Sequence, residues 1–166
     1  MAKVLIVLAP ERFQDDEYLV PRNILENNGI EITIASTKEV AISSTGKEEK
    51  VDILLKDATT DYDAILLVGG IGATIYIEDL IMHKLLNDFK NENKIISAIC
   101  ISPATLARSG VLEGKKATIY PGKKELITDL GIEYVDDSVV VDGNVITANG
   151  PVAAKEFGET IVKKLE

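Results

Sequence analysis

The chain contains a single cysteine, Cys100, and the residues around it are typical of a turn between a strand and a helix. The apolar run "IISAI" ends directly before it, and the helix-like stretch "SPATLARSG" begins two residues after it. Free N–H groups at a helix start carry partial positive charge and favour a thiolate over a thiol. We therefore expect Cys100 to have a lowered pKa and to act as a nucleophile. The alternative is an inert buried residue, because free cysteine is among the most buried residue types.

Two other stretches of the chain could contribute to the same site. The glycine-rich segment "VGGIGAT" follows a buried strand, and one of its backbone N–H groups could face the space above Cys100. An equally open interpretation is a loop that needs positive φ at Gly69, Gly70 or Gly72. The segment is neither a GxGxxG dinucleotide motif nor a phosphate-binding loop, since no lysine follows it. Glu17 lies near the start of a predicted helix, where an acidic residue usually just favours the helix dipole.

The remaining reactive side chains are weaker candidates. His83, the only histidine, lies nearly a whole helix away from the glycine-rich loop, so we expect a solvated or packing role. Tyr76, Tyr120 and Tyr134 are interpreted as packing residues rather than proton donors. One histidine and one cysteine argue against a structural zinc site. One cysteine also cannot form an internal disulfide, which fits a reducing compartment.

Hydrophobic patterning predicts the strands that must position these residues. Runs that are apolar on both faces are typical of central strands in a parallel sheet. They occur at residues 3–9, 30–37, 61–70 and 94–100, and a further strand is expected at residues 115–122. Two hairpins are predicted, a small one over residues 39–55 and another around Asp142 and Gly143.

Helices are predicted between these strands. Asp15 and Asp16 offer N-caps for the first helix, which Gly29 closes, and Pro21 stands early enough in it to be tolerated. Further helices are expected at residues 77–93, 102–110, 123–131 and 151–166. The helix over residues 77–93 is amphipathic, and its predicted apolar face consists of Leu80, Ile81, Leu85, Leu86 and Phe89.

The alternation of strands and helices predicts an α/β fold. Such an order favours a doubly wound, mainly parallel sheet with helices on both faces. No linker, repeat or low-complexity tract interrupts residues 1–166, so we expect a single domain. Ligand sites in these sheets lie outside the carboxyl ends of the strands, where "LAPERFQDDE", "LVGGIGAT" and "AICISPA" fall.

Composition excludes several classes of partner. The formal net charge is -9 over 166 residues, and no run of lysine or arginine interrupts the acidic background. Nucleic acid and anionic membrane surfaces are therefore poor partners. No apolar stretch reaches the length of a membrane span, and the start of the chain lacks the pattern of a signal peptide. We expect a cytoplasmic protein.

Three stretches together resemble the DJ-1/PfpI superfamily. They are "RFQDDEYLVPRNILENNG", "DAILLVGGIGA" and "IISAICISPATLARSGVLEGKKATIYPG", in the same order and spacing as in that superfamily. The similarity extends through the terminal "NGPVAAKEFGETIVKKL" and covers nearly the whole chain. Members include intracellular-protease homologues, stress chaperones, glyoxalase III enzymes and proposed protein deglycases. The resemblance implies a flavodoxin-like fold and a homodimer or larger homo-oligomer.

The resemblance also assigns roles to individual residues. Cys100 matches the reactive cysteine at a nucleophile elbow, and Glu17 matches a glutamate that hydrogen-bonds its sulfur, often as a protonated acid. Gly70 and Ile101 match the positions whose backbone N–H groups face the site. A carboxyl beside a thiolate in a partly dry pocket has a raised pKa, since two adjacent negative charges are unfavourable. Such a carboxyl can serve as a general acid or base.

Three positions depart from the family pattern. Protease-like members have a histidine directly after the cysteine, where this chain has Ile101. They also take an acidic partner from the loop after the glycine pair, where Thr74 or a neighbour stands here. The DJ-1 branch often has a histidine in the strand after the elbow, where this chain has Tyr120. A Cys–His dyad is therefore absent, and we do not expect protease activity.

The chemistry we expect is attack of Cys100 on a small reactive carbonyl such as methylglyoxal. Glu17 moves the proton during rearrangement toward a hydroxy acid, and the N–H groups of Gly70 and Ile101 stabilise the oxyanion. No metal or cofactor is needed. Two alternatives stay open: a redox-responsive stress protein in which an oxidant converts Cys100 to a sulfinate, and a subunit with a vestigial site.

Overall fold

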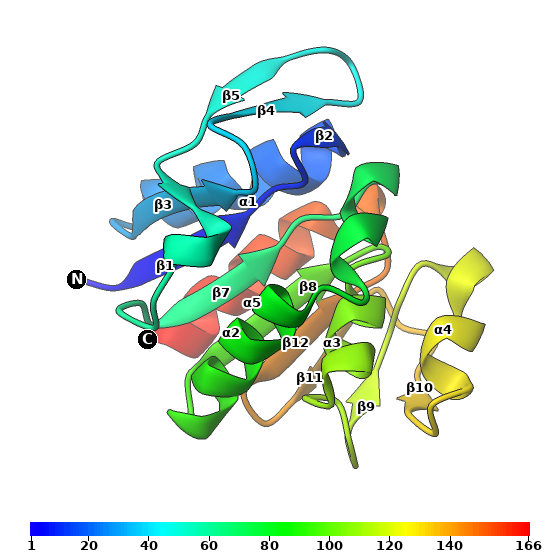
Figure 1. The fold of residues 1–166 in the computed structure, drawn as a ribbon. Helices are drawn as coiled ribbons and strands as arrows, with labels where there is room; N and C mark the ends of the chain where they lie inside the picture. The colour runs from blue at the N-terminus through cyan, green and yellow to red at the C-terminus, as the bar shows by residue number, and fades with distance from the viewer.

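The computed structural model describes all of residues 1–166 and contains one seven-stranded sheet between two layers of helices (Figure 1). The strand order is β11-β12-β8-β7-β1-β3-β6. Every pairing is parallel except that of β11 with β12. The strands are β1 (Lys3–Val7), β3 (Glu31–Ser36), β6 (Ile53–Leu54), β7 (Ala64–Leu67), β8 (Ile95–Ile99), β11 (Val139–Asp142) and β12 (Val145–Ala148).

The helices cover both faces of the sheet. They are α1 (Asp15–Asn27), α2 (Leu80–Asn91), α3 (Pro103–Ser109), α4 (Glu125–Thr128) and α5 (Ala154–Leu165). Figure 1 shows α1 and α5 on one face and α2 and α3 on the other, and each pair is in contact. A Cβ on Gly158 of α5 would stand 3.0 Å from the Cα of Pro21 in α1, so these two helices approach closely. The predicted doubly wound, mainly parallel α/β fold is confirmed.

The central strands are buried on both faces because helices cover both. All five residues of β8 and all four of β7 are buried, and all of them except Ser97 belong to one hydrophobic core. Burying a large aliphatic side chain contributes roughly 1.5–3 kcal/mol, so these strands are strongly held in register. This rigid sheet fixes the loops at its carboxyl edge.

The predicted strand at residues 115–122 is not part of the main sheet. Only β9 (Lys116–Ala117) forms, and it pairs with β10 (Glu133–Tyr134) in a separate two-stranded sheet. Side chains take the backbone donors here, because Lys116 N–H donates to Asp142 and Thr118 N–H donates to Thr147. The ladder cannot continue without those donors. The helix predicted at residues 123–131 is also shortened, to α4 after a 3-10 turn at Pro121–Lys123.

The start of α1 differs from the prediction by one residue. Gln14 is the N-cap, and its side-chain oxygen accepts a hydrogen bond from the N–H of Glu17 at 2.7 Å. Asp15 and Asp16 therefore stand inside the first turn, where their charges favour the helix dipole. Pro21 lies inside the helix, as expected.

The small hairpin belongs to a second sheet that the sequence pattern predicted only in part. The strands β4 (Val40–Ser43) and β5 (Glu48–Lys50) form the predicted antiparallel hairpin, but most of the run expected as its second strand, at residues 50–55, lies outside it, and Ile53–Leu54 pairs in parallel with β3 in the main sheet. A third strand, β2 (Glu11–Phe13), pairs in parallel with β4. The loop after β1 is therefore held against the hairpin rather than left free.

The apolar face predicted for α2 is wrong at its first turn. Leu80 and Ile81 are 79% and 53% exposed, whereas Met82, Leu85, Leu86 and Phe89 are buried. The buried set has the spacing i, i+3, i+4, i+7 of a single helical face. Leu80 and Ile81 lie off that face, because successive residues turn by about 100° around a helix and these two precede the buried Met82 directly.

The C-terminal elements agree with those predicted. The strands β11 and β12 form a hairpin around Asp142 and Gly143, where Gly143 has a φ of 61°. A 3-10 turn at Pro151–Ala153 leads into α5. No helix in the chain combines the length and the apolar character that crossing a membrane requires.

Candidate functional site

The carboxyl ends of three neighbouring parallel strands bring the predicted site residues together. Cys100 directly follows β8, and the glycine pair Gly69 and Gly70 follows β7. Glu17 stands in the first turn of α1, which comes after β1 and β2. Because β1, β7 and β8 are adjacent, the three segments meet at one edge of the sheet (Figure 1).

Cys100 occupies a strained elbow. Its φ is 64°, a left-handed conformation that is uncommon for residues other than glycine. Its N–H donates to the Ala148 carbonyl at 2.9 Å, and its carbonyl accepts from the N–H of Tyr120 at 2.9 Å. The hydroxyl of Ser102 donates to the Val68 carbonyl at 2.9 Å and ties the elbow to the end of β7. The predicted strand-to-helix turn is confirmed, and its neighbours hold the strained conformation.

Gly69 separates the two reactive side chains. A Cβ at this position would stand 2.3 Å from Oε1 of Glu17 and 2.7 Å from Cβ of Cys100. It would also stand 2.8 Å from the Ile99 carbonyl. Glu17 and Cys100 therefore both pack against the Cα of Gly69. Glycine is required here by lack of space, because among the three glycines of this loop only Gly70 has a positive φ, at 101°.

Glu17 is completely buried, and neither of its carboxyl oxygens has a protein partner with hydrogen-bond geometry. Burial raises its pKa to about 7, and the charge of Asp16 acts in the same direction. The nearby thiol of Cys100 and the N–H of Gly69 keep the pKa from rising further. A carboxyl with a pKa near neutrality both accepts and donates protons readily, which is the property a general acid–base needs.

The expected lowering of the Cys100 pKa is wrong in direction. Burial raises the pKa of the thiol to about 12, and the neighbouring charge of Glu17 adds to the effect. The N–H groups of Gly70 and Ile101 act in the opposite direction but do not outweigh burial. In the resting protein the sulfur is therefore a thiol, and the group beside it that can take its proton is Glu17.

The N–H groups of Gly70 and Ile101 are available to a ligand. Neither donates to a backbone carbonyl or to a side-chain acceptor, and both lie close to the sulfur of Cys100. Two unpaired N–H groups beside a sulfur could stabilise an oxyanion that forms there. The structure thus places all four predicted residues in one cluster: Cys100, Glu17, Gly70 and Ile101.

No histidine or additional carboxylate completes this cluster. His83 lies on α2, where its Nε2 is 2.6 Å from the Ile77 carbonyl. The exposed Thr74, at the position where protease-like members have an acidic partner, donates its hydroxyl to the Ile71 carbonyl at 2.9 Å. The titratable side chains that the structure brings together here are Cys100 and Glu17.

The tyrosines divide into structural residues and one neighbour of the elbow. Tyr76 donates its hydroxyl to the Leu8 carbonyl at 2.7 Å and is buried, while Tyr134 bonds to Asp136. Tyr120 is half-exposed and borders a hollow of about 510 Å³ beside the elbow. The rest of this lining comes from Pro121, Ser138, Asn149, Gly150, Pro151, Val152, Ala153 and Glu156.

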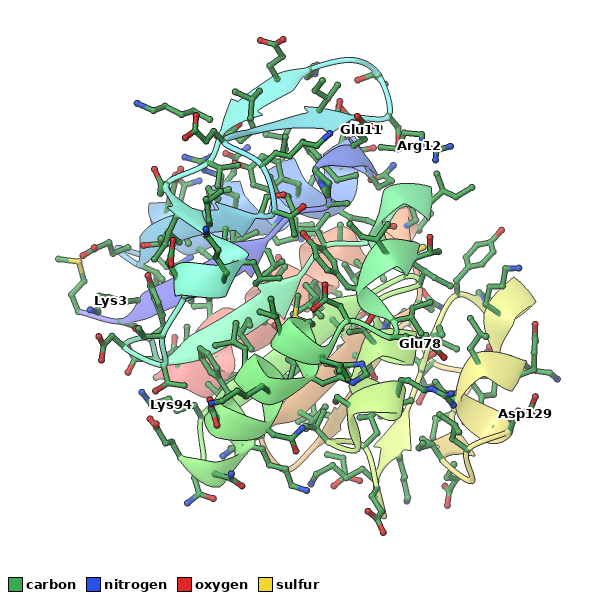
Figure 2. The ribbon with its side chains drawn as sticks, viewed as in Figure 1. Lys3, Glu11, Arg12, Glu78, Lys94 and Asp129 are labelled. Carbon is green, nitrogen blue, oxygen red and sulfur yellow. The ribbon has the colours of Figure 1, made fainter.

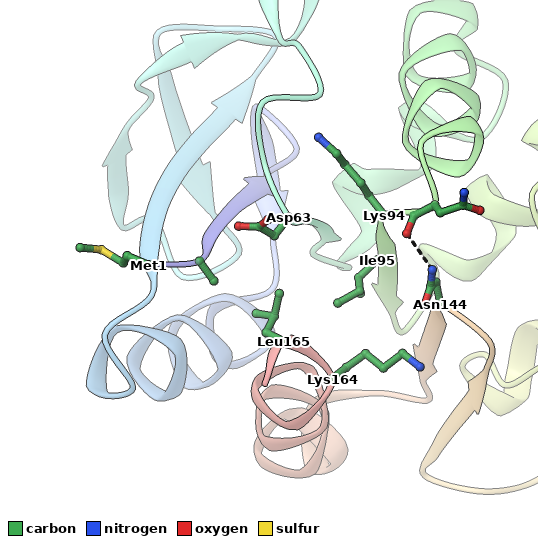
Figure 3. Close-up of a pocket in the computed structure, with 9 residues that line it drawn as sticks. Met1, Asp63, Lys94, Ile95, Asn144, Lys164 and Leu165 are labelled. Carbon is green, nitrogen blue, oxygen red and sulfur yellow. Dashed lines mark hydrogen bonds between the residues drawn. The ribbon is translucent and has the colours of Figure 1, made fainter.

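A second hollow, of about 550 Å³, lies at the opposite edge of the sheet (Figure 3). Its lining includes Met1, Asp63, Lys94, Asn144 and Lys164, near the amino ends of the strands. It holds no nucleophile and lies far from the elbow in the fold. No group of three or more His, Cys, Asp and Glu side chains is arranged to hold a metal ion.

The raised pKa of Glu17 predicts a pH-dependent stability. Between pH 4.5 and about 7 the folded protein holds a proton on Glu17 that the unfolded chain has lost. The free energy of unfolding should therefore fall as the pH rises through this window, by roughly 3 kcal/mol for this group. Glu17→Gln should remove that dependence and be more stable than the wild type at pH 8. Urea unfolding of the two proteins at pH 5 and pH 8 measures the pH dependence and the difference in stability. An identical pH dependence in the two proteins would mean that burial does not raise the pKa of Glu17.

Comparison with known proteins adds an independent line of evidence. Residues 2–164 match the DJ-1/PfpI family. An uncharacterized protein of Methanocaldococcus jannaschii is 43% identical over 99% of this chain and 83% of its own length. The glutathione-independent glyoxalase DJR-1.2 of Caenorhabditis elegans is 32% identical over 98% of this chain and 88% of its own. Deglycase PfpI of Pyrococcus furiosus is 32% identical over 98% of this chain and 99% of its own.

A solved structure gives the same result for the fold. The crystal structure of Drosophila melanogaster DJ-1beta superposes with a TM-score of 0.92 at 33% identity. The match covers 99% of this chain and 90% of the other. The similarity therefore includes the whole sheet and the loops at its carboxyl edge.

Proposed function

The chain belongs to the DJ-1/PfpI family, and from this membership and the Cys100–Glu17 cluster we propose that it converts small reactive carbonyls into hydroxy acids. Methylglyoxal is the representative substrate. The observation that carries the proposal is Glu17, a buried carboxyl without a hydrogen-bond partner, packed on the same glycine as the cysteine. Relatives named as a glyoxalase and a deglycase support it.

In the first step Cys100 adds to the aldehyde carbon of the substrate. The sulfur forms the new bond while ionised Glu17 takes the thiol proton, which compensates for the raised pKa of the thiol. The aldehyde oxygen becomes an oxyanion facing the N–H groups of Gly70 and Ile101. Glu17 then returns its proton to this oxygen, which gives a hemithioacetal and regenerates the carboxylate.

In the second step the hemithioacetal rearranges. Glu17 removes the C–H proton from the former aldehyde carbon, which gives an enediolate, and returns it to the adjacent carbon, while the hemithioacetal hydroxyl proton passes to the oxygen of that adjacent carbon. The product is a 2-hydroxyacyl thioester on Cys100. Water then cleaves the thioester, releasing the hydroxy acid and the thiol. One carbon is oxidised and its neighbour reduced within the same molecule. In sum, the α-oxoaldehyde and one water molecule give the hydroxy acid. This reaction needs neither a metal nor a redox cofactor.

A second candidate function uses the same cluster without turnover. A peroxide would oxidise Cys100 to a sulfinate whose oxygens accept hydrogen bonds from Gly70 and Ile101. The two unpaired N–H groups support this alternative, while a thiol with a raised pKa reacts slowly with peroxide. Peptide hydrolysis is not part of either proposal, because Ile101 replaces the histidine that would act as its base. We further propose that the protein acts on small molecules as a homodimer or larger homo-oligomer.

The decisive experiment follows methylglyoxal and its product together. Wild-type protein without added glutathione or metal should consume methylglyoxal and form one equivalent of lactate. Protein alkylated at Cys100 with iodoacetamide is the control and should form none. A wild type that forms no lactate, yet gains two oxygen atoms at Cys100 in mild peroxide by intact mass, would replace this proposal with the redox alternative.

A further inference from the structure

We propose that Arg12 selects anionic substrates for the Cys100 site. The substrates would be reactive carbonyls that carry a carboxylate or phosphate a few bonds from the reacting carbon. This inference rests on the proposed function and narrows its substrate class. The inference comes from four observations. Arg12 lies beside Gly70, its backbone conformation is uncommon, its guanidinium has no ion-pair partner, and its charge stands apart from Cys100 and Glu17.

Arg12 lies directly against the glycine that supplies one oxyanion N–H group. A Cβ on Gly70 would stand 2.6 Å from the Arg12 carbonyl oxygen. The N–H of Gln14 donates to the Gly69 carbonyl at 3.1 Å, which fixes this segment against the loop after β7. A substrate whose oxyanion is held by Gly70 therefore has Arg12 on the adjoining segment.

The backbone of Arg12 is held in an uncommon conformation. Its φ is 55°, and the pairing of β2 with β4 shifts register between Glu11 and Phe13. Only three residues other than glycine have a positive φ, and they are Arg12, Asn93 and Cys100. Asparagine tolerates this conformation, but arginine has no such preference. Strained backbone conformations gather at functional sites, so an arginine with a strained backbone near the strained Cys100 is a candidate for a functional role.

The guanidinium of Arg12 has no partner in the protein. Arg22 pairs with Glu26 and Glu49, and Arg108 pairs with Glu78. Arg12 is the one arginine without a carboxylate within ion-pair distance, although the chain carries 27 acidic residues. Figure 2 shows Arg12, the middle residue of β2, on the same edge of the molecule as the turn after β7. Its side chain is exposed and available to a ligand.

The neighbouring acids do not compete for this cation. Glu11 pairs with Lys38 at 3.4 Å, and Asp15 accepts a hydrogen bond from Thr45 at 2.6 Å. The planar guanidinium fork matches carboxylate and phosphate in a bidentate geometry, which a lysine does not provide. An exposed, unpaired arginine on the segment that adjoins Gly70 thus suits an anion brought by the substrate.

Arg12 acts at a distance from the reacting atoms. Its charge is not among the groups that shift the pKa of Glu17 or of Cys100. The Arg12 backbone lies against Gly70 while its side chain is exposed, so the guanidinium would bind a part of the substrate that is separated from the carbonyl carbon. For this reason the anion must stand several bonds away, as in an α-oxoaldehyde with a short carboxylated tail.

The test compares two α-oxoaldehydes of similar size. The anionic probe is 4,5-dioxovalerate, and the neutral probe is 2-oxopentanal. In the wild type kcat/KM should favour the anionic probe, and Arg12→Asn should reduce that preference at least tenfold, the range expected for a lost charge-assisted hydrogen bond. Asparagine tolerates the positive φ, so the change removes the cation with little added strain. Arg12→Lys should restore part of the preference, and Arg108→Asn, whose cation lies on α3, should leave it unchanged.

A purely structural role of Arg12 would slow both probes and leave their ratio unchanged, and that result would overturn the inference. Inorganic phosphate as a competitive inhibitor distinguishes the two anions. If phosphate inhibits the wild type and Arg12→Asn abolishes that inhibition, phosphorylated carbonyls belong to the substrate class. If phosphate does not inhibit the wild type, the class is restricted to carboxylates.

A second readout does not depend on turnover. The rates at which 3-maleimidopropionate and N-ethylmaleimide modify Cys100 should favour the anionic reagent severalfold more in the wild type than in Arg12→Asn. If no α-oxoaldehyde is turned over but this difference persists, the proposed function fails while anion selection by Arg12 stands. An equal ratio in both proteins would refute the selection itself.

Discussion

Replacing Glu17 by glutamine should slow methylglyoxal turnover at least hundredfold, and replacing Cys100 by serine should abolish it. Glutamine keeps the size of the side chain and a hydrogen-bond donor, but it cannot accept the thiol proton or carry hydrogen between the two carbons. General acid–base groups typically contribute a factor of about 10²–10⁴. The expected loss is therefore in kcat, measured as lactate formed per protein per second.

The two residues should behave as one unit. Because the sulfur reacts only when Glu17 takes its proton, the double variant should be no slower than Cys100→Ser alone. Glu31→Gln, an exposed glutamate at the start of β3, is the matched control and should keep wild-type activity. Thermal unfolding of each variant shows that the fold persists.

The same variants separate the two candidate functions. Glu17→Gln should still form a sulfinate in mild peroxide, because the N–H groups of Gly70 and Ile101 are unchanged. Glu17→Leu should lose turnover and also destabilise the sulfinate, since no donor remains on that side. If the wild type, Glu17→Gln and Glu17→Leu behaved alike in both assays, Glu17 would be only a helix-start carboxylate and the mechanism would be wrong.

Replacing Gly69 by alanine should destabilise the fold and abolish methylglyoxal turnover, because the added methyl group has no room between Glu17 and Cys100. The new Cβ would stand 2.3 Å from Oε1 of Glu17, 2.7 Å from Cβ of Cys100 and 2.8 Å from the Ile99 carbonyl. Real Cβ atoms do not approach other atoms this closely, and β8 cannot shift because it is buried on both faces. Overpacking of this kind costs about 1–3 kcal/mol and sometimes more.

The comparison that isolates this crowding is Gly46→Ala. Gly46 has a φ of 86°, and a Cβ added there would have no other atom within 4 Å, so alanine adds only backbone strain. Urea unfolding should show Gly69→Ala to be less stable than Gly46→Ala, and lactate formation should persist only in Gly46→Ala. A Gly69→Ala protein that kept both wild-type stability and activity would mean that Glu17 and Cys100 do not share this glycine.

Much of the fold follows from local pattern. Apolar runs bounded by glycine and polar turns predicted the buried strands, because a strand covered by helices on both faces has no polar side. The alternation with helices predicted the doubly wound sheet, and its carboxyl edge predicted that the loops holding Glu17, the glycine pair and Cys100 would meet. The roles of Gly70 and Ile101 came from the family resemblance. The weakly patterned segment at residues 115–122 was predicted incorrectly, because side chains of Asp142 and Thr147 take its backbone donors.

The sequence by itself determined which residues form the candidate site, and only the tertiary structure decided their chemical state. A helix start after Cys100 predicts a lowered pKa, yet burial and the facing Glu17 raise it, since desolvation depends on neighbours distant in the chain. The need for glycine at position 69 arises in the same way, from the approach of Glu17, Cys100 and Ile99. The left-handed backbone of Arg12 likewise coincides with the register shift in the pairing of β2 with β4. These properties depend on contacts between separate segments, and no local pattern records them.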